Sequence, residues 1–533
     1  MLDKPNPRGP GSCGIDPGRD LSERPRILTV TRRKMVIGAA ATAIVYLAGV
    51  TGQWWATPDS AIYLELARSV ATGHGYVADG AVNARYPPGL PLALAGLRYL
   101  FGDGYWAANL FIALCGIAAA AAIYLAMREM TRETERAYAV TLSTVFSYGF
   151  YSFSHRIMSD VPYTLAFWLM MYAALRYVGG ARRWLIAAVV MSAVGTLIRL
   201  PGILLAVSAA VGLALQQGAQ RARRMVAGAA IVTAGGVVCL GFFAFARMAG
   251  GVTPNYVNTV APFVTDPVSH LGARTAATAV ALARTVTQVF AGQEAMWPLG
   301  LAAIALGLAG LVVLWRSGEK LPVALAVLYP AFLAELLNAN GMNVRYFLPV
   351  APVMFYALLS GVGWGAQAIC ALKAKPYPRA AARWAIAATA CISIAANFPR
   401  VAREAFYFSY LSHTPRYFKE IHPNNPTTFL EAADTVERYC PKDATVGAEP
   451  GAVGIISYLT GRRTVSIIKL SGRDESHDVV NALDFVKKRR DVDFILVTSG
   501  LSGEVRNRMR AALDADASFE CVCNAPLAYR RVR

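Results

Sequence analysis

Long apolar runs recur along most of this 533-residue chain, and they constrain its fold more than any other feature. A helix needs about 17–25 apolar residues to cross a hydrocarbon core about 30 Å thick. Eleven runs that approach or reach this length lie at residues 35–53, 106–127, 137–153, 160–178, 184–198, 200–216, 225–248, 297–315, 321–338, 346–371 and 384–398. Because 55% of the residues are hydrophobic and only 16% are charged, the sequence predicts an α-helical polytopic membrane protein of about 11 spans.

Basic residues collect between alternate runs, and this pattern predicts the orientation of the chain. The groups are Arg32 to Lys34, Arg128 to Arg136, Arg182 with Arg183, Arg221 to Arg224, Arg316 with Lys320, and Lys373 to Arg383. Loops rich in Lys and Arg stay in the cytoplasm. We therefore predict a multi-pass protein of the cell inner membrane with a cytoplasmic N-terminus, and an odd number of spans puts the C-terminus on the periplasmic side. The net charge of +19 is then a topology signal and does not indicate nucleic acid as a partner.

Composition divides the chain into three predicted domains. Residues 1–34, rich in Pro, Gly and Arg, are expected to be a disordered cytoplasmic N-terminus ahead of an uncleaved signal anchor. Residues 35–404 form the transmembrane domain. In residues 405–533, short β-rich runs (ATVGAE, TVSII, DFILVTS) alternate with helical ones (GAVGIISYLTG, VVNALDFVKKR, EVRNRMRAALDA). This alternation predicts a small exterior α/β domain.

Two further segments are predicted to lie at the outer surface. Residues 59–103 form a large first outer loop, in which DSAIYLELARSV has helical spacing with Ile62, Leu66 and Val70 on one side. The apolar part of NARYPPGLPLALAGLRYLFGDG is too short to span the bilayer, so we expect it to lie in the interface. The mixed segment at about residues 250–295 is expected to cover the same surface.

Two carboxylates, Asp59 and Asp160, stand where apolar segments meet this outer face, and together they suggest a site there. Each also has a purely structural interpretation. Asp59 is a good N-cap for a helix that begins at Ser60 or Ala61. Asp160 precedes Val161 and Pro162, which is typical of a first helical turn. The sequence alone does not choose between these roles.

Several cations and aromatic residues occupy the same face. Arg199 lies between two apolar runs, Arg345 and Tyr346 follow the ninth run, and Arg85 and Tyr86 precede a Pro-Pro pair. A charge that borders hydrocarbon is costly unless it is paired or hydrated, so these arginines are candidates for binding a phosphate. The alternative, purely structural role of these arginines is to lie at a helix end with the side chain extended toward water.

Other ionisable residues are weaker candidates. They are His155, Arg156, Glu335 and His270, the last spaced four residues from Asp266. A single His at a helix end is usually structural. Glu335 lies inside an apolar run, where it needs a partner, and that partnership can be structural only.

The cysteines and glycines outside the apolar runs give little support for a zinc-binding or nucleotide-binding protein. In an oxidising compartment, Cys440 is a candidate for a disulfide with Cys521 or Cys523. Cys521 and Cys523 have too few partners for a zinc site. The stretch GAEPGAVG has neither fingerprint spacing nor a P-loop lysine, so no nucleotide cofactor is predicted.

Five stretches occur in the order typical of one enzyme superfamily: PDSAIYLELARSVATGHGY, YPPGLPLAL, SDVPYTLAFWL, IRLPGILL and RYFLPVAP. Over residues 35–400 the chain resembles membrane glycosyltransferases of the C superfamily. Within it, the similarity is to the branch of protein O-mannosyltransferases and lipid A aminoarabinose transferases. The resemblance implies inverting transfer of a hexose or pentose from a polyprenyl-phosphate carrier to an acceptor lipid, glycan or protein at the outer face. It also implies that Asp59 is the essential catalytic carboxylate.

The chemistry of such a transfer suits these residue types. A base must take the proton of the acceptor hydroxyl, and cations must stabilise the departing phosphate. Asp59 is the candidate base, and Asp160 is a candidate for orienting the acceptor or holding a divalent ion. In the aminoarabinose branch an acid precedes the Pro-Pro pair and is tied to metal binding, whereas this chain has Ala84, Arg85 and Tyr86. A divalent metal cofactor is therefore left open, and an aminoarabinose donor is in doubt.

Two other functions remain open. A glycan-chain ligase or polymerase also uses polyprenyl carriers, and substrate size, which the sequence does not reveal, separates it from a single-sugar transferase. A non-catalytic lipid or solute transporter would place broken helices and polar residues near the midplane in two related halves. Here the ionisable residues gather toward one face, and we find no repeat.

Overall fold

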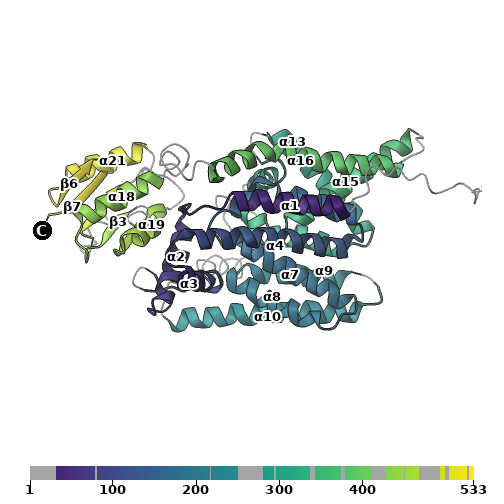
Figure 1. Ribbon diagram of the computed structural model, residues 1–533, viewed down its shortest axis with the longest axis horizontal. Coiled ribbons are helices and arrows are strands. Elements are labelled where there is room, and N and C mark those ends of the chain that lie inside the picture. The colour runs from purple at the N-terminus through teal and green to yellow at the C-terminus, as the bar shows by residue number, and fades with distance from the viewer. Residues whose placement is uncertain are drawn as a thin grey trace, which may run out of the picture.

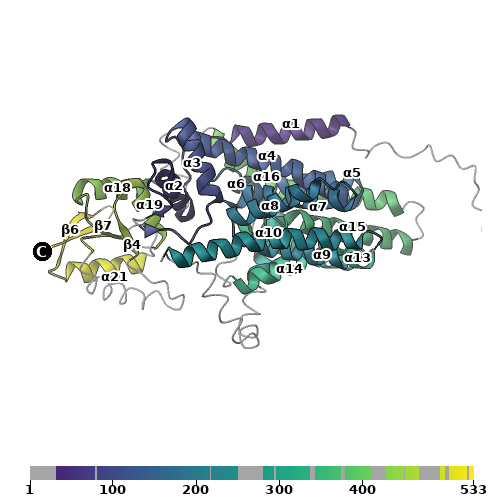
Figure 2. The same ribbon diagram turned by 90° about the horizontal axis from the view of Figure 1, so that it is seen from below.

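The computed structural model of this protein describes residues 32–78, 81–216, 218–249, 280–292, 296–336, 343–373, 378–409, 426–448, 450–466, 492–497, 503–524 and 527–532. These residues form an elongated helical bundle and a smaller domain that contains a β-sheet (Figure 1). The sheet domain lies at one end of the bundle, and the chain enters the first helix at the opposite end (Figure 2). The predicted disordered segment lies outside the described residues except at its end, because the first helix begins at Arg32.

The apolar runs form the bundle. Its helices include α1 (Arg32–Ala48), α4 (Tyr105–Thr131), α5 (Thr134–Val145), α6 (Tyr148–Phe153), α7 (Asp160–Val178), α8 (Trp184–Ile198), α9 (Gly202–Leu215), α10 (Arg221–Met248), α13 (Trp297–Arg316), α14 (Lys320–Leu336), α15 (Ala351–Leu372) and α16 (Pro378–Ser409). A further apolar helix spans Val280–Ala291. All eleven predicted runs lie mainly in these helices, so the predicted helical membrane fold is confirmed. Within the described part of the chain, α4, α10, α13, α15 and most of α16 are long and apolar enough to cross a bilayer on their own.

The third run is broken in two, which the apolar pattern did not predict. Helix α5 ends at Val145, and α6 starts at Tyr148. The backbone N–H of Tyr148 donates to the side-chain oxygen of Asn397 in α16 at 2.9 Å. A free N–H at a helix start is costly in an apolar bundle, and Asn397 removes that cost.

Residues 59–103, which were predicted to form the first outer loop and are called by that name below, contain two helices, as predicted. They are α2 (Pro58–Ala71) and α3 (Gly89–Phe101), and between them a short hairpin pairs β1 (Val77–Ala78) with β2 (Ala81–Val82). Helix α3 begins in close contact with the end of α8, since a Cβ at Gly89 would lie 2.7 Å from the Leu197 carbonyl oxygen. Glycine is therefore needed at this position, and the contact holds the loop against the segment that carries Arg199.

The C-terminal domain is α/β, as predicted. It contains α18 (Pro426–Tyr439), β3 (Val446–Ala448), α19 (Pro450–Thr460), β4 (Thr464–Ser466), β5 (Phe494–Val497), α21 (Gly503–Asp514), β6 (Phe519–Asn524) and β7 (Leu527–Arg531). The strand order is β4-β3-β5-β7-β6, in which β3 is parallel to β4 and β5, and β7 is antiparallel to β5 and β6. The hairpin of β6 and β7 was not predicted. The predicted helix VVNALDFVKKR lies outside the described residues.

The predicted disulfide is wrong, because Cys440, Cys521 and Cys523 are all free thiols. The carbonyl of Cys440 accepts from Arg462 Nη2 at 2.8 Å, next to the edge strand β4. Cys521 and Cys523 lie on β6, the opposite edge of the five-stranded sheet. Four strand spacings amount to roughly 19 Å, whereas a disulfide needs Cα atoms within about 7 Å. Burial also raises the pKa of Cys440 to about 11, so its thiol is protonated at neutral pH.

The C-terminal domain docks on the first outer loop through α19. Arg68 of α2 donates from Nη1 to the Tyr458 carbonyl at 3.2 Å, and its guanidinium lies 4.2 Å from the centre of the Tyr458 ring. Trp54 packs edge-on against the same ring. Gly454 lies so close to α2 that a Cβ there would be 3.2 Å from Ile62. The sheet domain therefore contacts the helix that carries Asp59 (Figure 2).

Candidate active site

Asp59 is the second residue of α2, and its side chain does not cap that helix. Thr57 is the N-cap: its side-chain oxygen accepts from Ser60 N at 3.1 Å, and its own N–H donates to Ser60 Oγ at 2.9 Å. Pro58 occupies the first helical position, where the missing N–H costs nothing. The N-cap interpretation of Asp59 is therefore wrong, and the carboxylate projects from a rigid helix start toward other partners.

Groups far away in the sequence bind both oxygens of Asp59. Arg345 Nη1 donates to Oδ2 at 2.7 Å. The Tyr86 hydroxyl donates to Oδ1 at 2.7 Å. The Asp59 side chain keeps 24% of its surface exposed, and Arg345 keeps 23%. The structure thus brings together three of the residues that the sequence singled out, at a place that remains open to solvent.

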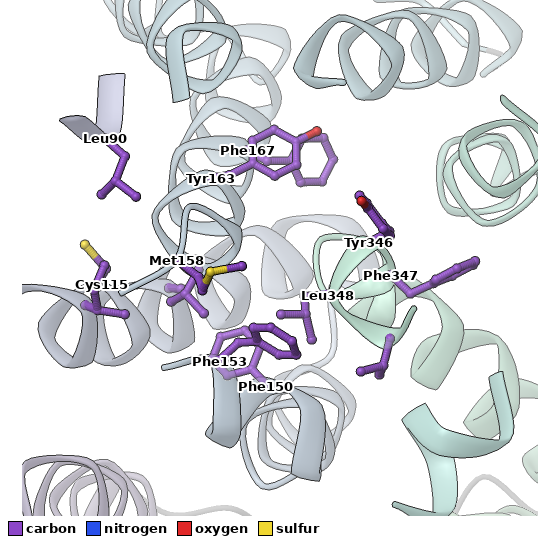
Figure 3. Close-up of a cluster of buried hydrophobic side chains, with 14 of the residues drawn as sticks. Leu90, Cys115, Phe150, Phe153, Met158, Tyr163, Phe167, Tyr346, Phe347 and Leu348 are labelled. Carbon is purple, nitrogen blue, oxygen red and sulfur yellow. The ribbon is translucent and has the colours of Figure 1, made fainter. Parts of the chain in front are cut away.

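Arg345 lies on a short 3-10 helix, η4 (Val344–Phe347), between α14 and α15. Asn343 caps this turn by accepting from Arg345 N at 3.3 Å. Phe347 and Leu348 are fully buried and lie in the same apolar cluster as Phe150 of α6 (Figure 3). This anchorage in the core fixes the backbone of η4, so the Arg345 guanidinium is presented from a rigid base.

Asp160 forms the second acid–base pair of the site. It is the first residue of α7, and Arg199, from the link between α8 and α9, forms a salt bridge with its Oδ1. The Asp160 side chain is fully buried, and its Oδ2 has no hydrogen-bond partner among the described residues. Although an acid in the first turn is favourable for the helix dipole, Asp160 caps no N–H; Ser159 occupies the N-cap position without a side-chain bond.

Tyr346 joins the two pairs. The guanidinium carbon of Arg199 and that of Arg345 each lie 4.9 Å from the centre of its ring. Arg345 Nη2 also donates to the Tyr346 hydroxyl at 3.0 Å. An aromatic face stabilises a nearby cation by about 0.5–2 kcal/mol, depending on burial. Two like charges are therefore held close together by one ring and by one carboxylate each.

Tyr63 ties the first outer loop to the start of α7. Its hydroxyl lies 3.0 Å from Ser159 Oγ, and its ring packs edge-on against Tyr86 at 5.1 Å. Sequence reasoning did not select Tyr63. Its position four residues after Asp59 on the same helical face was the available signal.

The charges of the site shift the pKa values of its members in a consistent way. Burial alone would raise the pKa of the Asp59 carboxyl, but Arg345 and Tyr86 outweigh that effect and lower it below its ordinary value. Burial and the Asp59 carboxylate raise the pKa of Tyr86, so its hydroxyl remains a donor. At neutral pH the site therefore contains an ionised Asp59 held by two donors.

Arg85 stands at the edge of this site. Its side chain is exposed, and its guanidinium carbon lies 5.4 Å from the centre of the Tyr86 ring. Asn83 Oδ1 accepts from the backbone N–H groups of Arg85 and Tyr86 at 3.0 and 3.1 Å. This turn fixes the backbone ahead of Pro87 while leaving the Arg85 side chain available to a ligand.

His155 and Arg156 lie outside the two acid–base pairs. The ring nitrogens of His155 are each 2.9 Å from a backbone carbonyl, those of Tyr46 and Tyr151, which is a structural arrangement. Arg156 Nη2 lies 3.5 Å from Glu404 Oε1 in α16. Glu404 was not selected from the sequence, although it is a carboxylate that follows the last apolar run.

Two predicted residues lie outside what is described. Glu335 belongs to α14, but its side chain is not among those described, and His270 falls between residues 249 and 280. Within the described residues there is no group of three or more His, Cys, Asp or Glu side chains that could hold a metal ion. Asp59 and Asp160 are each bound by an arginine. These described side chains do not fit a divalent cation site.

Several solved structures have a fold similar to that of this chain. ArnT from Cupriavidus metallidurans in the apo state is 14% identical, with a TM-score of 0.57 over 94% of this chain and 98% of that one. The same protein bound to undecaprenyl phosphate gives 15% identity and a TM-score of 0.54, over 94% and 99%. An oligosaccharyltransferase from Archaeoglobus fulgidus, tethered to an acceptor peptide, is 12% identical with a TM-score of 0.54, over 94% and 74%. No curated protein matches by sequence.

The chain thus has the same fold as ArnT and the archaeal oligosaccharyltransferase, in agreement with the fold that the resemblance of the ordered sequence stretches implied. Residues 90–516 match the family of predicted membrane proteins DUF2079, and the chain belongs to that family. The matched region begins in α3 and ends in the C-terminal domain.

Proposed function

We propose that this protein is an inverting glycosyltransferase that moves a single sugar from a polyprenyl-phosphate carrier to an acceptor hydroxyl at the outer face of the membrane. One observation carries the proposal: a partly exposed carboxylate, Asp59, lies against a cluster of arginines at one end of a membrane bundle. The fold supports it, since a structure with the same fold contains undecaprenyl phosphate.

The arginines are suited to bind the donor phosphate. Arg345 and Arg199 converge on the Tyr346 ring, and Arg85 lies at the exposed edge next to Tyr86. Guanidinium groups bind phosphate oxygens through paired hydrogen bonds, and they stabilise the charge that grows as the phosphate leaves. The polyprenyl tail would lie along the bundle, in contact with membrane lipid.

In the proposed reaction, Asp59 acts as the general base. The acceptor oxygen attacks the anomeric carbon while the bond from that carbon to the phosphate oxygen breaks. The acceptor proton passes to Asp59, and polyprenyl phosphate departs with the bonding electrons. Asp59 suits this role better than Asp160, because its side chain is 24% exposed whereas that of Asp160 is fully buried.

Arg345 must change partners during this cycle. As the structure stands, it binds Asp59 and holds the pKa of Asp59 low, which makes a weak base. A donor phosphate that engages Arg345 would weaken its bond to Asp59 and raise the basicity of the carboxylate. The base would then be strongest when the donor is in place.

Asp160 is proposed as a positioning residue. Its Oδ1 holds Arg199, and its second oxygen has no partner among the described residues. Full burial excludes direct proton transfer from an acceptor in this arrangement. Asp160 therefore fixes the guanidinium that faces Tyr346.

The exterior domain is proposed to guide an acceptor to the site, because α19 packs directly on α2. The acceptor is a lipid, glycan or protein, and the sugar is a hexose or pentose. A glycan-chain ligase would use the same carboxylate and arginines. Mass spectrometry of the product distinguishes the two, since a ligase adds an assembled chain and a single-sugar transferase adds one residue.

The proposal is tested by binding of undecaprenyl phosphate to the purified protein in detergent, followed by native mass spectrometry. We expect the intact protein to bind this probe and Arg345→Gln to bind it at least about tenfold more weakly, which corresponds to one lost charge-assisted bond. Arg98→Gln is the matched control, because Arg98 lies on the same outer loop but pairs with Asp103 instead of Asp59 or Asp160. Equal binding by all three proteins would reject the phosphate site.

A further inference from the structure

A cavity opens at the opposite end of the bundle from Asp59. It has a volume of about 790 Å³ and lies between α5, α13, α15 and α16. This is the size of a site for a small organic ligand. The cavity lies at the end of the bundle where α1 begins. Tyr138 of α5 lines the cavity, and its hydroxyl donates to the carbonyl of Lys34 at 3.2 Å. By the distribution of basic residues, this end faces the cytoplasm.

One end of the cavity is lined by equal numbers of acids and bases. They are Glu133, Glu135, Glu319, Arg136, Arg379 and Arg383. Two loose pairs form among them: Arg136 Nε to Glu133 at 3.3 Å and Arg383 Nε to Glu135 at 4.0 Å. Glu319 accepts from the Tyr356 hydroxyl at 2.6 Å. Arg136 and Glu135 are only partly exposed, whereas Glu133 and Arg383 are largely exposed. Surface pairs of this length contribute at most about 1 kcal/mol, so a ligand can displace them at low cost.

Arg379 is the most available cation of the group. Its side chain is exposed, and it forms no ion pair within the part of the chain that the structure describes. Arg383 lies one helical turn further along the same helix. Two guanidinium groups at this spacing suit a phosphate group.

The rest of the cavity is mainly apolar, with a few polar residues such as Ser360 and Gln367, and it runs into the membrane. Leu142, Val313, Trp364, Ile386 and Ile394 line it. From Arg379 to Ile394 helix α16 rises about 22 Å. Half of the hydrocarbon core is about 15 Å thick. The cavity is therefore long enough for a polar group at the cytoplasmic surface and an acyl chain within one leaflet.

We propose that this cavity binds a phospholipid whose headgroup contains both a phosphate and a primary ammonium. Arg379 and Arg383 bind the phosphate, and carboxylates of the same cavity accept hydrogen bonds from the ammonium. The balance of charges favours a zwitterion over an anionic lipid, since the arginines can pair with its phosphate while the carboxylates pair with its ammonium, a partner that an anionic lipid lacks. This inference does not depend on the proposed transfer reaction.

The site is tested with the full-length protein purified in mild detergent and stripped of lipid. The probes are dioctanoyl phosphatidylethanolamine, the matching phosphatidylglycerol, the matching phosphatidylcholine, dioctanoylglycerol and inorganic phosphate, each followed by native mass spectrometry and thermal unfolding. We expect the phosphatidylethanolamine to bind at least about tenfold more tightly than the others, because only it offers both charges and N–H donors. Binding of inorganic phosphate alone would identify a free-phosphate site and overturn the proposal.

Variants locate the binding. Arg379→Glu with Arg383→Glu is expected to weaken phosphatidylethanolamine binding about tenfold or more. The same exchange at Arg182 and Arg183, exposed between α7 and α8, is the control and should leave binding unchanged. Ala387→Trp keeps every charge but fills the apolar part of the cavity, and it should also abolish binding. If both cavity variants bind like the control, the lipid lies elsewhere and the proposal is wrong.

Discussion

Arg345 and Asp59 are 286 residues apart in the sequence, and their side chains form a 2.7 Å hydrogen-bonded ion pair. Each group comes from a rigid element: Asp59 from the capped start of α2, and Arg345 from a 3-10 turn anchored in the core. The pair gives the first outer loop a fixed position against the last part of the bundle. It also places a cation beside the proposed base.

Replacement of Asp59 by Asn tests the base. We expect transfer to fall by about 10²–10⁴-fold, because the amide cannot take the acceptor proton. The amide oxygen still accepts from one of the two donors, Tyr86 or Arg345, and the other bond is lost, so we expect the protein to fold with a loss of about 1–3 kcal/mol in the free energy of unfolding. Asp103→Asn is the control, since Asp103 is 75% exposed on the same outer loop. Turnover rate and melting temperature are measured for both, and normal turnover by Asp59→Asn ends the base assignment.

Removal of Arg199 tests the buried pair. Arg199→Ala leaves the fully buried Asp160 charged and unpaired, and we expect a loss of about 3–5 kcal/mol in the free energy of unfolding. Asp160→Asn added to Arg199→Ala should recover much of this stability, because it removes the uncompensated charge. Transfer should remain low in the double variant. A double variant that is no more stable than Arg199→Ala would show that the pair is not what holds this region.

We expect the acid limit of activity to depend on Asp59. Because the pKa of Asp59 is lowered, the stabilisation from its ionised form is present above the ordinary value of about 3.9 and is lost as pH falls through the folded value. Tyr86→Phe removes one of the groups that lower this pKa, so the acid limb of kcat/KM should move to higher pH. Tyr99→Phe, at a residue 81% exposed, is the control. An unchanged limb in Tyr86→Phe would contradict the role of this hydrogen bond.

The contact between the two domains is tested at Gly454. A Cβ there would lie 3.2 Å from Ile62 and 3.4 Å from the Pro58 carbonyl, so Gly454→Leu must push α19 away from the start of α2. We expect slower transfer and a loss of about 1–3 kcal/mol in the free energy of unfolding, which is typical of an overpacked site. The melting temperature should fall accordingly. Gly96→Leu adds the same side chain to α3, where no atom lies within 4 Å. If both variants behave alike, docking of the C-terminal domain does not matter for the site.

The sequence predicts much of the fold because local patterns determine it. Apolar runs and basic loops locate the helices of the bundle, and the spacing in DSAIYLELARSV predicts α2. The break before Tyr148 depends on a distant side chain, Asn397, and no local signal marks it. The strands β1 and β2 have only two residues each, which is too short for an alternating pattern.

The site was predictable as a set of residues but not as a set of contacts. Asp59, Arg345 and Tyr86 were singled out by residue type and by their place at one face, whereas their pairing depends on how the segments pack in three dimensions. The capping role expected for Asp59 belongs to Thr57, which lies only two residues earlier. Cys440 was assigned a disulfide partner on the opposite edge of the sheet, because strand order is not visible in the sequence.

The central claim is tested most directly by measuring polyprenyl-phosphate sugars by mass spectrometry in cells that lack this protein, complemented with the intact chain or with Asp59→Asn. We predict that one polyprenyl-phosphate monosaccharide accumulates in the deletion strain and in the Asp59→Asn strain, and that the intact chain removes it. Unchanged pools of these lipids in all strains would contradict the proposed transfer reaction.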